Sequence, residues 1–287
     1  MADTSGQSTI RGINIQDIAV GFADEANIFK QFLTNSTTGS RTIRYWAKTA
    51  GFITGTTTTG ITTSPIYNVA FGALPTVAEQ SWTRYEVEVK KYFVESPWLT
   101  LEDLRDSPLS ILATNVRDLT RAVANQVDAR IYAVLSGSLL LSGSVAGAGW
   151  ISATANPVMD ILSGSAVIRG YSYDISNLAL LLHQNDYKNL MNYIITTKGS
   201  SIPQYASNKV ESGVLLNFMG VRIVVSNNCT AGIPVMLVPQ TAATWFSFVP
   251  ITTATKEEEG IGTKIRVWEE GDIVLTNPYA GYVMKGA

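Results

Sequence analysis

The chain has few residues that could do chemistry, and their spacing favours no catalytic site. The single histidine, His183, follows the apolar run 178–182. A histidine acts as a general base when a nucleophile and an orienting acid lie beside it. Asp186 and Ser172 or Ser176 are possible partners, but no motif fixes their distance from His183. We therefore interpret His183 as a structural residue at a strand end, and keep a hydrolase that uses it as the alternative.

Metal and cofactor sites have equally little support. The single cysteine, Cys229, has no Cys or His at the spacing of zinc ligands. Carboxylates cluster at 257–259 and again at Glu269, Glu270 and Asp272, but consecutive acids lack the loop spacing of a calcium site. Neither a phosphate-binding loop nor a Gly-x-Ser-x-Gly elbow occurs. We predict no catalytic residue, metal or cofactor, and interpret the acids as a solvated or subunit-contacting face.

Composition indicates a globular protein with an unusually small share of charged residues. The 287 residues are 46% hydrophobic and 15% charged, and the formal net charge is −2. A chain of this length can bury a substantial core in one or two domains. The net charge argues against a nucleic-acid binder that acts through bulk charge. The sequence shows no apolar signal core and no run long enough for a membrane span, so we expect a soluble protein made in the cytoplasm.

One long amphipathic helix is predicted over 108–136. Ser107 is a suitable N-cap, and Pro108 fits the first helical position. Gly137 is expected to end the helix. The apolar stripe comprises Ile111, Leu112, Val116, Leu119, Val123, Val127, Ile131 and Leu135, and the polar face comprises Asn115, Arg117, Asp118, Arg121, Asn125, Gln126, Asp128 and Arg130. At about 1.5 Å per residue the helix would form a strut of roughly 40 Å.

An uncharged stretch precedes this helix. Residues 49–78 contain no Asp, Glu, Lys or Arg. Alternating patterns at 41–47 and 82–94 predict the two legs of a long hairpin, with this stretch as its tip. A two-stranded ribbon is marginal alone in water, and its apolar side chains need cover. A neighbouring subunit and the chain's own core are both open as the covering surface.

The remaining patterns predict an α+β fold. Residues 136–155 are rich in Gly, Ser and Ala and are interpreted as a linker. Helices are expected at 156–168 and 185–193. Strands are expected at 178–182, 214–218, 221–225, 235–238, 245–249, 264–268, 273–276 and 282–284, with a turn at Gly271-Asp272.

The order of these parts resembles the major capsid proteins of tailed bacteriophages, whose coat fold is shared with encapsulins. Residues 117–128 (RDLTRAVANQVD) look like the family's spine helix. Residues 215–226 (LLNFMGVRIVVS) resemble a strand–Gly–strand segment of its axial domain, and 268–273 (WEEGDI) resembles the turn before its closing strands. The resemblance depends on the order and spacing of these segments across nearly the whole chain.

The resemblance implies a domain plan for the chain. Residues 1–36 would form an N-terminal arm, and 37–96 the extended β-hairpin loop that overlaps an adjacent subunit. The peripheral domain would comprise 97–149, with the spine helix, and 245–274. The mixed α/β axial domain would comprise 150–244 and 275–287.

The resemblance also implies a structural protein of the virion that assembles in the host cytoplasm and is not an enzyme. The chain would form hexamers and pentamers of an icosahedral shell around packaged double-stranded DNA, touching the DNA weakly and without sequence specificity. Partners would include a portal and separate scaffolding or cement proteins, but no membrane. The residues expected at subunit interfaces are Phe52, Ile53, Ile61, Ile66, Tyr67, Phe71, Glu257, Glu258, Glu259, Arg266, Glu269 and Glu270. An encapsulin shell around a cargo enzyme is the nearest alternative, and a β-rich adhesin or tail component is a further one.

Overall fold

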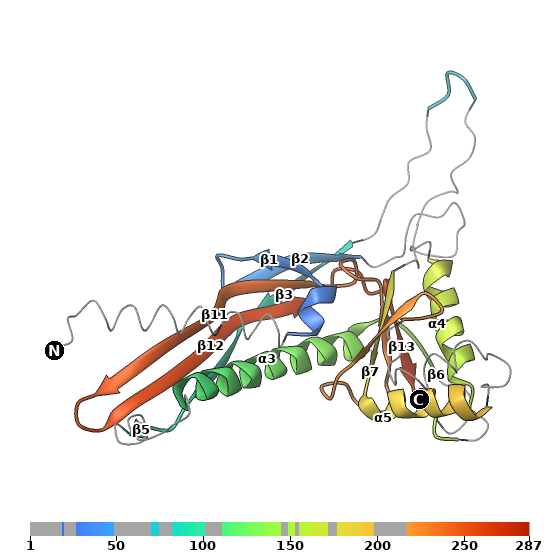
Figure 1. Ribbon diagram of the computed structural model, residues 1–287. Coiled ribbons are helices and arrows are strands. Elements are labelled where there is room, and N and C mark those ends of the chain that lie inside the picture. Colours follow the sequence, from blue (N-terminus) through green and yellow to red (C-terminus); the bar gives the residue numbers. More distant parts are fainter. Residues whose placement is uncertain are drawn as a thin grey trace.

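The computed structural model describes residues 19, 27–48, 70–74, 82–100, 111–144, 149–152, 155–171, 177–197 and 217–286. The molecule is elongated at one end and compact at the other, and one long helix runs from the elongated end toward the compact one (Figure 1). The described strands form two sheets and a two-stranded ribbon. This is the mixed α and β architecture that the sequence predicts.

The long helix is α3, Ile111–Ser138. Its predicted cap, Ser107 and Pro108, lies outside the described residues. The predicted apolar stripe is confirmed, because Val116, Val123, Val127, Ile131 and Leu135 are all buried. Gly137 does not end the helix, which continues through it to Ser138. The chain turns away only at Leu139, whose side chain is buried in the main core.

The long sheet lies along α3 at the elongated end. Its strands are β1 (Thr34–Thr37), β11 (Thr244–Glu258), β12 (Gly262–Val274) and β4 (Lys90–Glu95), in that order, with β5 (Leu99–Thr100) also on β12. Strands β11 and β12 form a long antiparallel hairpin, most of which the sequence patterns missed.

The predicted turn at Gly271-Asp272 is wrong, because both residues lie inside β12. Gly271 pairs with Ser247, and Asp272 pairs with Phe246. A Cβ on Gly271 would come within 2.7 Å of both the Phe246 carbonyl oxygen and the Trp245 ring. The glycine therefore permits close packing of backbone and indole within a continuous strand, and the Gly-Asp pair is not a chain reversal.

The hairpin legs are β2 (Thr42–Lys48) and β3 (Trp82–Glu88), which pair antiparallel as predicted. The predicted second leg is not one strand, because the chain breaks at Val89 and continues as β4 in the long sheet. One face of the ribbon packs on the chain's own body, where Ile43 and Ala47 are buried. The open question of what covers the legs is thus answered for that face.

The compact sheet has the strand order β6, β13, β10, β7, β9, β8. These strands are β6 (Leu141–Ser144), β13 (Gly281–Lys285), β10 (Val235–Leu237), β7 (Leu178–Leu182), β9 (Val221–Val225) and β8 (Asn217–Phe218). The linker predicted for 136–155 is wrong at β6, which pairs parallel with β13. Gly143 suits this pairing, because a Cβ there would lie 1.9 Å from the Tyr282 hydroxyl.

Helices α4 (Pro157–Gly170) and α5 (Gln184–Asn192), followed by the π-helical turn η2 (Tyr193–Thr197), share a core with one face of this sheet. Both helices were predicted within two residues. The Asn156 side chain caps α4 by accepting the N–H of Met159, and Pro157 occupies its first turn. The other face of the sheet packs on the C-terminal half of α3.

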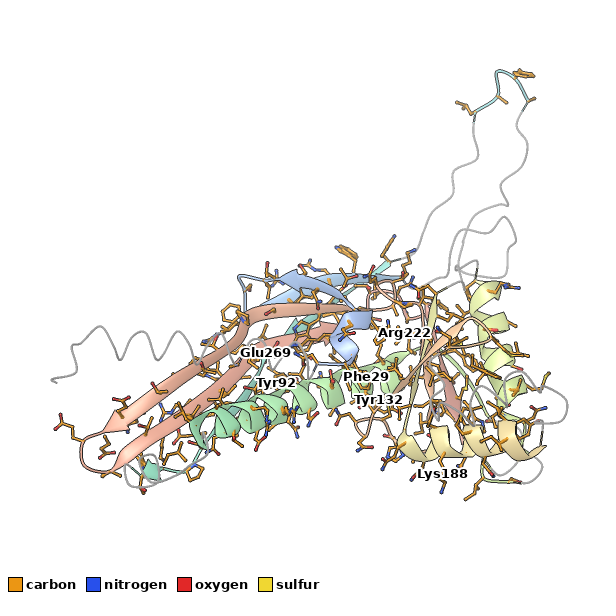
Figure 2. All side chains as sticks on the ribbon, in the orientation of Figure 1. Phe29, Tyr92, Tyr132, Lys188, Arg222 and Glu269 are labelled. Carbon is orange, nitrogen blue, oxygen red and sulfur yellow. The ribbon has the colours of Figure 1, made fainter. Side chains whose placement is uncertain are left out.

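A short 3-10 helix, η1 (Phe29–Phe32), sits where the two sheets meet. Phe29 packs against Tyr132 of α3 with ring centroids 6.5 Å apart, and Figure 2 shows the two side chains together at this junction. Phe32 and Leu33 enter the same core as Leu181 of the compact sheet and Ile273 of the long sheet. The part of the predicted N-terminal arm that the structure describes is therefore folded into the body.

Candidate assembly surfaces

Residues 70–74, the tip loop, form the described part of the uncharged stretch. The N–H of Ala73 donates to the Ala70 carbonyl at 3.0 Å, and Gly72 has φ of 85°. A β-turn with positive φ at its third position favours glycine there. The turn presents Phe71 and Leu74, whose exposures are 111% and 92% of their reference areas. The loop lies well clear of both sheets (Figure 1).

The other predicted interface residues of the hairpin fall outside the described part of the chain. They are Phe52, Ile53, Ile61, Ile66 and Tyr67. Phe71 is the predicted hairpin contact whose surroundings the structure describes, and its nearly complete exposure suits a side chain that a second molecule covers.

The outer face of the β2–β3 ribbon adds two exposed tryptophans, Trp46 and Trp82. Trp46 pairs with Arg84, and Trp82 pairs with Lys48, so the indoles are diagonal neighbours across the ribbon. The Lys48 ammonium lies 5.6 Å from the centre of the Trp82 ring. This amphipathic face was not among the predicted interface residues. The alternation of Arg44, Trp46 and Lys48 against buried Ile43 and Ala47 is the sequence signal that could have found it.

The acidic residues Glu257, Glu258 and Glu259 lie at the far end of the β11–β12 hairpin and are exposed. Gly260, with φ of 75°, and Gly262 close the turn. No group of three metal-ligating side chains gathers anywhere in the described part of the chain. The acidic turn is thus a charged tip at the end of a ribbon, exposed to other molecules.

Three other predicted interface residues have partners within their own chain. Glu95 accepts from Arg266 at 2.6 Å and from Lys264 at 2.9 Å, and these two cations lower the pKa of the Glu95 carboxyl. Glu270 pairs with Lys91 at 3.3 Å. Glu269 is buried and pairs with Lys30 of η1. Glu269 lies on the same face of β12 as the buried Ile265 and Val267, four and two residues before it, and this period of two could have placed it inside.

Asp128 was predicted on the polar face of α3, and this prediction is wrong because its side chain is fully buried. Its carboxylate accepts the N–H groups of Ile28 and Phe29 at 3.0 and 3.3 Å. Burial raises the pKa of Asp128 to about 6, although the two N–H donors and Lys30 oppose that rise. On the same helix, Arg130 binds the buried Asp272 through two bonds of 3.0 Å. These carboxylates attach η1 and β12 to the long helix.

His183 serves as the N-cap of α5. Its Nδ1 accepts the N–H of Asn185 at 3.2 Å. Asp186 is buried and accepts the N–H of Gly232 at 3.0 and 3.1 Å, while Ser172 and Ser176 lie outside the described residues. The histidine thus has the structural role that we favoured from the sequence.

The single cysteine, Cys229, is buried. Burial raises the pKa of its thiol to about 12, so the thiol stays protonated at neutral pH.

No described helix meets the length and hydropathy needed to cross a bilayer.

The sequence profile of the phage capsid protein family matches residues 84–284, well over half of the chain. The chain belongs to the phage capsid protein family. Among curated protein sequences, none matches it.

Solved structures show that this capsid protein also has the capsid fold. The capsid of the cyanophage P-SCSP1u aligns with a TM-score of 0.68 at 11% identity, over 90% of this chain and 88% of that chain. Mycobacterium phage Che8 gives a TM-score of 0.65 at 16% identity, over 91% of both chains. A virus-like particle from Pyrococcus furiosus gives 0.65 at 11% identity, over 96% of this chain and 99% of that one. The resemblance predicted from the order of parts is confirmed.

Proposed function

We propose that this capsid protein is the major structural subunit of a virion, and that copies of it assemble into an icosahedral shell around packaged double-stranded DNA. The family match and the shared fold support this proposal. The observation that carries it is the tip loop, because Phe71 and Leu74 are apolar side chains that their own subunit leaves uncovered. Further copies would remove this surface from water, as in obligate assemblies.

The domain plan assigns the contacts of such a shell. The long sheet with α3 would be the peripheral domain, and the compact sheet with α4 and α5 would be the axial domain, around which hexamers and pentamers form. The uncharged loop would overlap an adjacent subunit. A portal and separate scaffolding or cement proteins would complete the particle. The protein would not act as an enzyme, and assembly would take place in the host cytoplasm.

Electron microscopy of particles from cells that express the protein tests the proposal. We expect uniform hollow spheres from the full chain. Deletion of residues 51–75 should leave a folded subunit, with unchanged far-ultraviolet circular dichroism from α3 and the sheets, that forms no spheres. Normal spheres from the deletion variant would refute the role of the loop, and a monomer at high concentration would refute the shell.

An encapsulin-type shell around a cargo protein is the second candidate, favoured by the match to the Pyrococcus furiosus particle. The contents of native particles decide between the two: nuclease-protected double-stranded DNA supports the virion, and a single enriched protein supports the encapsulin. His183→Ala is the control for hydrolase activity, and it should leave assembly unchanged because it removes only a helix cap.

A further inference from the structure

A groove lies between η1 and the outer strands of the compact sheet. Its volume is about 480 Å³, and it is lined by Ile28, Gln31, Phe32, Asn217, Arg222, Ile223 and Val224. A volume of this size is usual for binding pockets, which combine an apolar lining with a few polar groups that orient the ligand. The polar side chains here are one arginine and two carboxamides. The groove therefore suits an occupant that is partly apolar and carries a negative charge.

Arg222 supplies the positive charge of the groove. Its guanidinium lies 5.1 Å from the centre of the Phe32 ring, and Figure 2 shows Arg222 on the η1 side of the compact sheet. Among the described residues no carboxylate pairs with Arg222, whereas Arg130 and Arg266 each bind one from their own chain. A guanidinium held on an aromatic ring can bind a carboxylate through two parallel hydrogen bonds. The groove thus presents a preorganised carboxylate site.

The groove also borders an open sheet edge. β8 is the last strand of the compact sheet, and β9 is its partner in the described part of the chain. Asn217 pairs directly with Arg222, so both side chains lie on the groove face, while Phe218 is buried in the core on the other face. An open strand edge presents backbone N–H and C=O groups to which a further strand can bond.

We propose that this groove binds an extended acidic peptide of a second, different protein, which adds as a strand to the edge of β8 and places a carboxylate on Arg222. Side chains alternate along a strand, so every second residue of the peptide would point into the groove. Apolar residues at those positions would cover Phe32 and Val224. Backbone bonds would supply part of the affinity, and Arg222 would select acidic sequences.

A separate protein suits the groove better than the exposed acidic segment of a second copy. That segment, Glu257–Glu259, lies in the stretch 252–260, which has no apolar side chain larger than alanine to fill the groove. The stretch also carries Lys256, which would bring a like charge toward Arg222. The contact goes beyond the proposed function, because it needs no shell and is testable on the unassembled subunit.

Peptide selection on the purified full-length subunit tests the proposal. A displayed library of random dodecapeptides is selected on the wild-type protein and counter-selected on Arg222→Glu. We expect enriched sequences in which apolar residues alternate with Asp or Glu. Enriched sequences without acids would overturn the proposal, and so would a lack of enrichment over a surface without protein.

The affinity of the most enriched peptide, labelled with fluorescein, measures the role of the arginine. Arg222→Gln should raise its dissociation constant at least about tenfold. Arg222→Lys should raise it about threefold, because lysine keeps the charge but loses the planar fork. Arg169→Gln, at an exposed position of α4, is the matched control and should leave the dissociation constant unchanged. Equal binding to wild type and to a folded Arg222→Gln variant, checked by circular dichroism, would contradict the assigned contact.

N-methylation of the peptide backbone tests the strand geometry. Methyl groups on the edge that faces β8 should abolish binding, while methyl groups on the opposite edge should not affect it. Equal effects at both edges would overturn strand addition. Sedimentation without peptide covers the second copy as occupant: if wild type associates and Arg222→Gln does not, the groove belongs to a contact between copies and the separate partner is refuted.

Discussion

Asp128 shows how a charged residue can occupy an interior position when backbone donors meet it. The carboxylate accepts two N–H groups at the start of η1, where unpaired donors need an acceptor. In the sequence it looks like one more polar residue on a helix surface, because helical periodicity does not show that a segment about 100 residues earlier in the chain covers this position. Glu269 is a similar case, since its partner Lys30 lies 239 residues away.

Titration of Asp128 gives a prediction for stability. An unfolded aspartate titrates near 3.8 and the folded one near 6. The folded state holds this proton more tightly than the unfolded state does, so proton binding by Asp128 stabilises the fold. This stabilisation is complete below pH 3.8 and is lost as the pH rises through 6. The difference between the folded and unfolded pKa values of Asp128 corresponds to about 3 kcal/mol in the free energy of unfolding. Asp128→Asn keeps an oxygen acceptor but does not titrate, so the variant should gain stability relative to the wild type as the pH rises from 4 to 7.

Urea unfolding of the unassembled subunit at pH 4, 5, 6 and 7 measures this difference. Lys30 and Glu269 face Asp128 and remain in both proteins, so the two proteins differ only at position 128. Asp118→Asn, at an exposed position on the same helix, is the control for the removal of a charge. A constant difference between Asp128→Asn and wild type across this range would contradict the assigned pKa.

At the scale of elements, local patterns predicted helices better than long strands. The α3 stripe, the buried run of β7 and the capped helix α4 follow from periodicity and end signals that lie within the elements themselves. The β11–β12 hairpin did not follow, because its outer half contains Thr, Lys and Glu in place of a clear alternation. The sequence predicted a turn at Gly271 because it does not show the Trp245 ring, which packs where a Cβ would lie and comes from a strand distant in sequence.

Two helical glycines give an element-scale prediction. A Cβ on Gly164 of α4 would lie 3.0 Å from the Tyr282 ring and 3.2 Å from the Met284 methyl, whereas one on Gly137 of α3 would meet nothing within 4 Å. Gly164→Leu should therefore lower the free energy of unfolding by about 1–3 kcal/mol through overpacking. Gly137→Leu should raise it by about 0.5–1 kcal/mol through helix propensity.

Thermal or urea denaturation of the two variants compares the same substitution at two sites. Equal effects would mean that α4 does not pack closely on β13.

For the whole molecule, the order of parts identified the family although no single motif did. A long hairpin, a strut helix, a mixed module and a β return are recognisable even where element boundaries are wrong. The sequence could not show which charges are used internally, since Arg266, Glu269 and Glu270 all find partners in strands or segments far along the chain. Their pairing leaves the acidic turn at Glu257–Glu259 as the exposed remainder of the predicted charged interface.

The uncharged loop predicts how assembly responds to solution conditions. If apolar contacts dominate, raising sodium chloride from about 0.1 to about 0.5 M should change the concentration needed for assembly by less than about threefold, because screening acts on charges. Sulfate at the same ionic strength should favour assembly, and cooling should weaken it. Light scattering measures each effect. Disassembly of particles by sodium chloride alone would show that ion pairs between subunits dominate.

The position of η1 has a consequence for biosynthesis. Residues 27–37 are translated long before their partners, because β1 pairs with 244–247 and Lys30 pairs with Glu269. Before residues 244–269 have been translated, this segment can meet its partners on α3 but lacks the β11 strand and the Glu269 carboxylate, so its Phe29 and Phe32 remain partly available to chaperones or to other nascent chains. A stalled chain ending near residue 240 should therefore stay protease-sensitive at residues 27–37, and extension beyond residue 269 should confer protection.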